Sequence, residues 1–293
     1  MRRSMLFIPG NTPNLLINGN FLGSDAVIFD LEDAVSPAEK DSARILVRNT
    51  MKYLDFRGCE TIVRINSIDT DYWKKDLDLV MTQKPNLIML PKTNTAADVQ
   101  EADSYMAEVE QRLGLAKNTV QLMPLIETAL GVENAFAIAT ASDRVTAMFL
   151  GAEDLTADLR CKRTKGGREI EYARGRMVMA ARAACVDVYD TPFTDVNDDE
   201  GIRTDAEYAK ALGFTGKAAI SPRHVEVINE VFSPSQADID YAYEVMDAIR
   251  MAKEQGKGAI ALRGKMIDAP IVARAKRTIE MAEALGLERE DTL

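Results

Sequence analysis

The hydrophobic positions of this sequence gather in eight short, continuous apolar runs. The runs span residues 5–8, 26–29, 61–65, 87–90, 120–126, 146–150, 186–189 and 218–220. Segments with helical spacing of apolar residues, such as 96–113 and 170–184, separate most of them. Because continuous rather than alternating apolar runs are typical of parallel strands covered on both faces, the pattern predicts eight β/α units.

Eight such units favour a TIM (β/α)8 barrel, a fold that typically takes about 250 residues. We expect residues 1–232 to form the barrel and 233–293 to form a C-terminal extension. The extension has a helical pattern over 234–255, then a glycine-rich turn or hairpin with Gly256, Gly258 and Gly264, and then a last helix. It is predicted to act as a lid over the mouth of its own or a neighbouring barrel. The alternative fold is a doubly wound open sheet, but FIPGNTPN does not resemble its glycine-rich phosphate turn.

Composition and charge narrow the class of protein. Hydrophobic residues make up 46% of the chain and the formal net charge is −10, which is typical of a globular protein and argues against nucleic acid as a partner. No apolar run approaches the roughly 20 residues that a membrane-spanning helix needs. The first apolar stretch stops at Pro9 and Gly10, unlike that of a signal peptide. We therefore expect a cytoplasmic protein.

Acidic residues follow three of the predicted strands. Asp30, Glu32 and Asp33 follow the second, Glu127 the fifth, and Asp154, after Glu153, the sixth. The carboxyl ends of barrel strands form the active-site face, and Mg²⁺ or Ca²⁺ prefers oxygen ligands. Glu127 and Asp154, from neighbouring strands, are predicted to bind one Mg²⁺. The alternative is that these acids form ion pairs on the rim of the barrel.

Basic residues at the same face suggest how an acidic substrate is held. Arg64, at the end of the third strand, can bind a substrate carboxylate with two hydrogen bonds, or it can form an ion pair with Glu32 or Asp33. The sole histidine, His224, is expected at the surface, so Ser-His-Asp hydrolysis is disfavoured. No lysine is expected inside an apolar strand, which favours a metal-dependent aldolase or lyase over an imine-forming enzyme.

Seven motifs add a family resemblance that covers residues 2–284. In order they are RRSMLFIPGN, VIFDLEDAV, IVRIN, LIMLPKT, PLIET, GAEDL and GKMIDAP. Together they resemble the β-subunit of citrate lyase and its relatives that cleave acyl-CoA thioesters of malate and citramalate. The resemblance implies a Mg²⁺-dependent lyase on a TIM barrel that assembles as a trimer or hexamer.

The resemblance also implies roles for individual residues. Glu127 and Asp154 would be the metal ligands and Arg64 would hold the oxo-acid end of the substrate. Glu32 and Asp33 would be catalytic acids that reach metal-bound water. Asp268, in the MIDAP motif, would be the acid/base on a lid that closes over an adjacent subunit. The alternative for Asp268 is a helix N-cap, because it precedes Ala269 and Pro270.

Further residues are expected to contact the substrate. These are Lys92, Pro124, Gly151, Ala152 and Glu153, with the backbone amides of residues 152–154 binding a carboxylate. A basic segment follows, and it either meets CoA phosphates or an acidic carrier protein or forms a solvated loop. Its members are Arg160, Lys162, Arg163, Lys165 and Arg168.

The predicted reaction is cleavage of a carbon-carbon bond in a 3-hydroxy-acyl thioester. The expected substrate is citryl-CoA or citryl on an acyl carrier protein, and the products are oxaloacetate and an acetyl thioester. Other citrate lyase subunits are possible partners. Three alternatives stay open: a malyl-CoA or citramalyl-CoA lyase, the corresponding thioesterase, and a mainly structural subunit of a multi-subunit lyase.

Overall fold

The predicted runs form the eight parallel strands of a closed barrel in the computed structural model, which describes residues 1–254 and 260–289. This confirms the predicted TIM barrel. The strands are β1 (Ser4–Pro9), β2 (Ala26–Asp30), β3 (Glu60–Arg64), β4 (Leu87–Leu90), β5 (Gln121–Ile126), β6 (Ala147–Leu150), β7 (Asp187–Asp190) and β8 (Gly216–Ala219).

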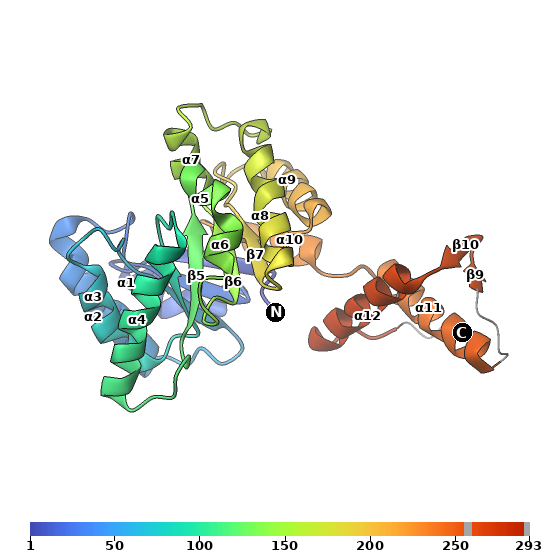
Figure 1. Ribbon diagram of the computed structural model, residues 1–293, viewed down its shortest axis with the longest axis horizontal. Helices are drawn as coiled ribbons and strands as arrows, with labels where there is room; N and C mark the ends of the chain where they lie inside the picture. Colours follow the sequence, from blue (N-terminus) through green and yellow to red (C-terminus); the bar gives the residue numbers. More distant parts are fainter. Residues whose placement is uncertain (255–259, 290–293) are drawn as a thin grey trace. The chain divides into compact units, whose positions relative to one another are not determined.

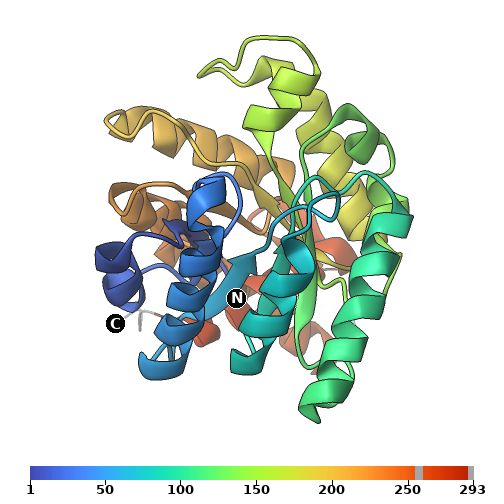
Figure 2. The same cartoon turned by 90° about the vertical axis from the view of Figure 1, so that its left-hand side faces the viewer.

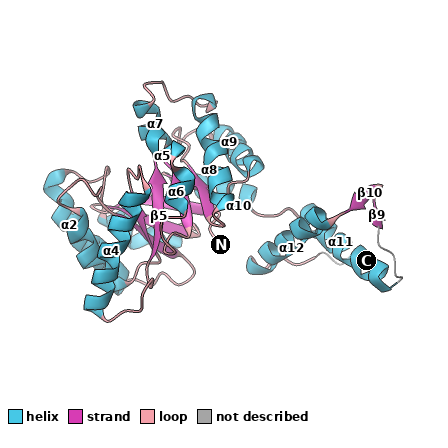
Figure 3. Ribbon diagram, viewed as in Figure 1, coloured by secondary structure: helices cyan, strands magenta, loops and turns pink. Residues whose placement is uncertain are grey.

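Helices surround the barrel strands, as Figure 3 shows by colour and Figure 2 shows from a second direction. The α-helices are α1 (Pro13–Asn18), α2 (Lys40–Tyr53), α3 (Trp73–Val80), α4 (Ala96–Leu113), α5 (Ala129–Glu133), α6 (Ala135–Ala139), α7 (Ala152–Asp158), α8 (Glu171–Ala183), α9 (Asp199–Leu212) and α10 (Arg223–Phe232). Short 3₁₀ helices are η1 (Gly19–Phe21), η2 (Pro37–Glu39), η3 (Met81–Gln83) and η4 (Arg168–Ile170).

Continuous apolar strands arise because both faces of the sheet are buried. In β1, Leu6 and Ile8 pack outward into the core between strands and helices, whereas Met5 packs inward with the residues that fill the barrel. Neighbouring side chains of a strand point to opposite faces, so both sets must be apolar. This explains why the runs do not alternate with polar residues.

Local sequence signals fix where the helices begin and end. At α4, Thr95 and Asp98 form a reciprocal capping box, and Gly114 ends the helix with a φ of 67°. These residues satisfy backbone groups that lack partners at helix ends, and glycine adopts positive φ without strain. The helical spacing predicted over residues 96–113 therefore coincides with α4.

Strand register determines which side chains meet at the carboxyl ends of the barrel. Asp30 and Arg64 are paired across β2 and β3. Ile126 and Leu150 are paired across β5 and β6, so that Glu127 and Gly151 follow them at the same level. Residues far apart in the sequence are thus neighbours on one rim.

The C-terminal extension is a separate compact unit that begins at Ser233, whereas the barrel unit comprises Arg2–Phe232. It contains α11 (Gln236–Glu254), α12 (Ala269–Ala284) and an antiparallel hairpin of β9 (Ile260–Leu262) and β10 (Lys265–Ile267), labelled in Figure 1. Residue 255 of the predicted helix and the predicted turn residues Gly256 and Gly258 lie outside the described residues.

No helix in the described part of the chain is both long and apolar enough to cross a membrane.

Two expectations were wrong, both near the end of the barrel. His224 is 0% exposed on the apolar face of α10, with its ring centroid 6.3 Å from that of Phe193, and is not a surface residue. Lys217 lies inside β8 and is 0% exposed, because that strand begins earlier than the apolar run 218–220 suggested. Lys217 forms ion pairs with Asp190 and Asp205, both at 2.6 Å, so its surroundings stabilise a charged amine rather than an imine-forming one.

Candidate active site

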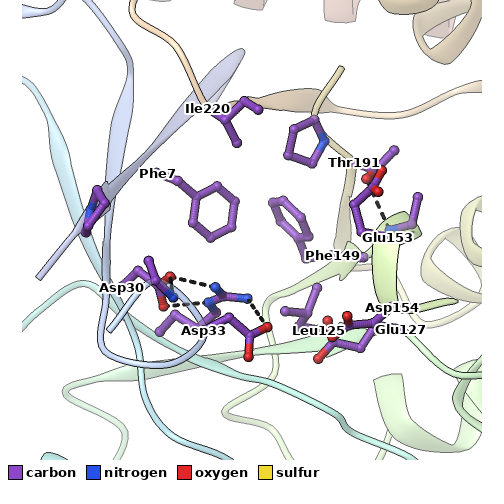
Figure 4. Close-up of a pocket in the computed structure, with 16 residues that line it drawn as sticks. Phe7, Asp30, Asp33, Leu125, Glu127, Phe149, Glu153, Asp154, Thr191 and Ile220 are labelled. Atoms are coloured by element: carbon purple, nitrogen blue, oxygen red, sulfur yellow. Dashed lines mark hydrogen bonds and ion pairs between the residues drawn. The ribbon is translucent and has the colours of Figure 1, made fainter. Parts of the chain in front are cut away.

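A cavity of about 430 Å³ opens at the carboxyl ends of the barrel strands (Figure 4). The edge-to-face pair of Phe7 and Phe149, with ring centroids 5.8 Å apart, lies in the middle of this view, and Leu125 also lines the cavity. Carboxylates occupy two separate parts of the wall. The cavity therefore combines an apolar surface with a few charged groups, as small-molecule sites usually do.

Arg64 is held in place by acids of the β2–α2 segment. Its Nε and Nη2 donate to Asp30 at 2.7 and 2.6 Å, and Nη1 lies 3.1 Å from Glu32. Burial lowers the pKa of Arg64, but the hydrogen bonds and charges of Asp30 and Glu32 outweigh this effect and raise the pKa overall. Arg64 therefore does form the ion pair with Glu32 that was the alternative to substrate binding, and it still lines the cavity.

Asp30 is the centre of this arrangement, although the sequence pattern marks it only as one of several acids at strand ends. Besides the two bonds from Arg64, its carboxylate accepts the backbone N–H groups of Glu32 and Ala34 at 2.9 and 3.2 Å. The buried ammonium of Lys40 donates to the carbonyl oxygens of Leu31 and Glu32 at 2.8 and 2.6 Å. The segment that carries Glu32 and Asp33 is therefore fixed from both ends.

Lys92 and Glu32 form the next pair along the rim. The Lys92 ammonium donates to Glu32 Oε1 at 2.7 Å and lies 3.6 Å from Asp33. Burial raises the pKa of Glu32 more strongly than Arg64 and Lys92 lower it. Asp33 lines the cavity, whereas Glu32 is a buried, ion-paired acid behind it.

Glu127 and Asp154 line another part of the cavity wall and lack a cationic partner among the described residues. Glu127 Oε1 accepts the backbone N–H of Lys92 at 2.6 Å. Burial, followed by the negative charges of Glu32 and Asp154, raises the pKa of Glu127 to about 8. A buried carboxylate whose pKa is raised in this way, with a second acid beside it, favours binding of a cation to the pair.

Gly151 leaves open the space beside this pair. A Cβ atom at position 151 would lie 2.8 Å from both Cβ and Oε2 of Glu127. Only a residue without a side chain therefore leaves Oε2 accessible. The two carboxylates, their oxygen chemistry and this open space fit a hard divalent cation such as Mg²⁺.

The remaining predicted substrate contacts fall in different places. Ala152 and Glu153 line the cavity, but the Ala152 N–H already donates to Thr191 Oγ1 at 3.1 Å. Lys92 is adjacent to the site through Glu32. Pro124 lies within β5, paired with Leu90, and its predicted contact with substrate stays a prediction.

Asp268 lies in the C-terminal unit, where it caps α12. Its carboxylate accepts the Ile271 N–H at 3.1 Å, so the N-cap alternative is present, and its acid/base role stays a prediction. The basic segment is partly paired within the chain. Arg163 contacts Glu169 at 2.8 Å, and Lys165 contacts both Asp195 and Asp198.

Comparison with known proteins identifies the family. A family model described as HpcH/HpaI aldolase/citrate lyase matches residues 3–222. The chain belongs to this family. Within the HpcH/HpaI aldolase/citrate lyase family, citrate lyase subunit beta from Leuconostoc mesenteroides subsp. cremoris is 43% identical over 97% of this chain and 94% of its own length.

Two further similar proteins are a thioesterase and a solved structure. The (3S)-malyl-CoA thioesterase of Cereibacter sphaeroides is 35% identical over 97% of this chain and 95% of its own length. The solved structure of protein CitE from Mycobacterium tuberculosis in complex with magnesium, acetoacetate and coenzyme A has a TM-score of 0.77 and 31% identity, covering 96% of this chain and 98% of that chain. The predicted family resemblance is confirmed.

The sequence pattern missed the roles of several residues. The role of Asp30, an acid at the end of β2, could have been found from its register with Arg64. Thr191 follows the seventh predicted strand, and the pattern gives it no role. Phe7 and Phe149 lie within two of the apolar runs, and an aromatic residue inside a strand gives the same pattern whether it lies under a cavity or within a packed layer.

Proposed function

We propose that this chain is a Mg²⁺-dependent lyase that cleaves a 3-hydroxy-acyl thioester, citryl-CoA or citryl on a carrier protein, to oxaloacetate and an acetyl thioester. The observation that carries the proposal is the pair Glu127 and Asp154, which share one cavity with Arg64 and have no cationic partner among the described residues. The citrate lyase subunit at 43% identity supports the choice of citryl.

Glu127 and Asp154 would hold the metal ion. Their fit rests on the raised pKa of Glu127 and on the space that Gly151 leaves beside its Oε2. The relative CitE, whose structure contains magnesium with acetoacetate and coenzyme A, supports Mg²⁺ as the ion. When bound, Mg²⁺ supplies a Lewis acid for the oxo acid that is being formed.

The protein's own groups would bind the substrate and move its proton. Arg64 holds the oxo-acid end with the donors that its contacts to Asp30 and Glu32 leave free. A base removes the proton of the 3-hydroxyl group, and the C2–C3 bond breaks as the 3-oxygen becomes a carbonyl. The electron pair of that bond passes to the acetyl thioester as an enolate, which then takes up a proton at carbon.

We assign the proton transfers to Asp268, supplied by the C-terminal unit of a neighbouring subunit in a trimer or hexamer. Glu32 and Asp33 would orient water and Arg64 at the rim. Lys92, Pro124, Gly151, Ala152 and Glu153 would line the substrate path. We further propose that the enzyme works in the cytoplasm, together with other citrate lyase subunits when the substrate is presented on a carrier protein.

The (3S)-malyl-CoA thioesterase among the relatives supports a second candidate. The same cavity would then direct water at the thioester carbonyl of a malyl substrate. The bond broken would be C–S rather than C–C, and the products would be the intact hydroxy acid and a free thiol.

One experiment separates these candidates. The purified chain is incubated with citryl-CoA, malyl-CoA and citramalyl-CoA, with Mg²⁺ or with chelator, and all products are identified by mass spectrometry. Mg²⁺-dependent oxaloacetate and acetyl-CoA from citryl-CoA support the proposal. Intact malate with free CoA would replace it by the thioesterase. Absence of turnover on all three, with a citryl carrier protein also inert, would overturn the catalytic assignment.

The shared-site assignment of Asp268 has its own test. A D268A chain and an E127Q chain, each inactive alone, are unfolded, mixed and refolded so that the subunits exchange. A site that takes its barrel from one chain and its lid from the next regains about a quarter of wild-type activity under random mixing. No recovery, with exchange verified by mass spectrometry of the oligomers, would contradict the assignment.

A further inference from the structure

Thr191 presents an unused hydrogen-bond donor at the cavity. It follows β7 at the carboxyl end of the barrel, lines the cavity and is 1% exposed. Its Oγ1 accepts the Ala152 N–H at 3.1 Å, a contact drawn in Figure 4. Within residues 1–254 and 260–289, no oxygen accepts the proton of the hydroxyl itself.

The backbone at Thr191 is held firmly in place. Its carbonyl oxygen accepts a hydrogen bond from the Lys217 ammonium at 2.6 Å. Lys217 is itself fixed by the buried carboxylates of Asp190 and Asp205. Because threonine is branched at Cβ, its side chain also has few accessible rotamers. The hydroxyl is therefore an oriented group rather than a mobile one.

A buried hydroxyl of this kind is expected to have an acceptor. Nearly all buried polar groups in proteins make hydrogen bonds, and a threonine hydroxyl can accept and donate at the same time. A hydroxyl that already accepts a hydrogen bond becomes a stronger donor. Since the protein around Thr191 offers no acceptor among its described residues, the acceptor has to come from what fills the cavity.

We propose that Thr191 is a substrate-binding residue whose hydroxyl donates to a carboxylate oxygen of the 2-oxo acid. The inference rests on the proposed function, because that function supplies the oxo acid. Thr191 contacts Ala152 at the start of α7, the helix that also carries Asp154. Thr191 and Asp154 line the same cavity, so a carboxylate bound there beside Asp154 can accept from the hydroxyl. A charged acceptor also makes the hydrogen bond stronger than a neutral one.

The test uses three variants of the full chain. T191V removes the hydroxyl with little change of shape, and T191S keeps it. T156V is the matched control. Thr156 lies on α7 and is buried like Thr191, but its hydroxyl already has acceptors within the protein, the backbone oxygens of Ala152 and Glu153 at 2.9 and 3.0 Å. Calorimetry measures the Kd of Mg²⁺ alone and of fresh oxaloacetate at saturating Mg²⁺, and kcat/KM is measured with citryl-CoA.

For T191V we expect oxaloacetate affinity and kcat/KM to fall about 10- to 100-fold, the effect of losing one hydrogen bond to a charged group. Its Mg²⁺ affinity, and all values for T191S and T156V, should stay within about threefold of wild type.

Two results would overturn the inference while leaving the proposed function intact. One is a T191V chain that binds oxaloacetate as well as T156V does. The other is a T191V chain whose Mg²⁺ affinity falls by the same factor as its oxaloacetate affinity, because Thr191 would then only position α7 and Asp154. A wild-type chain that neither binds oxaloacetate nor cleaves citryl-CoA would overturn the proposed function, and this inference with it.

Discussion

Two groups of charged residues at the cavity differ in whether their charges are paired within the protein. The paired side consists of Asp30, Glu32, Arg64 and Lys92, whose charges meet within 3.1 Å. The open side is Glu127 with Asp154, two neighbouring acids that have no cationic partner in the described chain. Both sides lie at the carboxyl ends of strands in one barrel, so the fold alone does not explain the difference.

The two sides have different roles: the paired side positions residues, and the open side binds a ligand. Charges that are fully paired inside the protein gain little from a ligand and hold their neighbours in fixed positions. Two acids that repel each other are destabilised, and a cation that binds them relieves that cost. The open side is thus where a ligand adds most free energy, and the paired side is the frame that presents Arg64 to it.

The largest expected effect comes from altering the open side itself. D154N should lower kcat/KM by at least about 1,000-fold, equivalent to about 4 kcal/mol of transition-state stabilisation, because a predicted metal ligand is lost. Stability in chelator should not fall, because the negative charge of Asp154 disfavours ionisation of Glu127 and its removal relieves that repulsion. Steady-state kinetics and urea unfolding with chelator measure both.

D158N is the matched control on the same helix, because Asp158 is exposed and its carboxylate accepts the Ala129 N–H, which an amide oxygen can also do. It should keep wild-type activity. A D154N chain with full activity would contradict the metal assignment, and so would one whose loss merely equals that of D158N.

Breaking the paired side should mainly destabilise the fold. R64M leaves the buried Asp30 carboxylate without its cation, and removal of one partner of a buried pair typically costs about 3–5 kcal/mol. R203M removes an arginine from the more exposed pair with Glu230 and should cost less than about 1 kcal/mol. Urea denaturation compares the two; equal losses would show that the paired side is no stronger than a surface ion pair.

The sequence predicted the barrel better than it predicted the site. Apolar runs report burial on both faces of a strand, so all eight strands were found, and family motifs marked Glu127, Asp154 and Arg64. The pairing of Asp30 with Arg64 was overlooked because the two residues are 34 positions apart in the sequence, and only strand register brings them together. Lys217 was not predicted to lie inside a strand, because the prediction relied on apolar residues. A buried lysine that is stabilised by two acids does not extend an apolar run.

The free energy of unfolding should depend on pH through Glu127 on the open side. The ordinary pKa of Glu127 is 4.5, and in the folded chain without metal it is about 8. Between these values the folded state holds a proton that the unfolded state has lost. The unfolding free energy should therefore fall as pH rises, by about 1.4 kcal/mol per pH unit relative to E127Q.

Urea unfolding of wild type and E127Q in chelator, from pH 5 to pH 8, measures this slope. Taking the difference between the two chains cancels titrating groups that do not interact with Glu127. Added Mg²⁺ should restore wild-type stability most at the alkaline end, because it binds the ionised form. If the difference in unfolding free energy between wild type and E127Q stays constant with pH, Glu127 is already ionised in the folded chain and its pKa is not raised.

The smallest expected effect tests where the paired side ends. Asp33 follows Glu32 directly, yet its side chain is 54% exposed against 6% for Glu32, and its distances to Arg64 and Lys92 are 3.9 and 3.6 Å. D33N should change stability by less than about 1 kcal/mol, as for a surface ion pair, whereas E32Q should cost clearly more. If D33N instead destabilises the chain as much as E32Q, the ion-pair network extends to the cavity surface. Asp33 would then be held as rigidly as Arg64, and a loss of kcat in D33N would no longer separate a catalytic role from a positioning one.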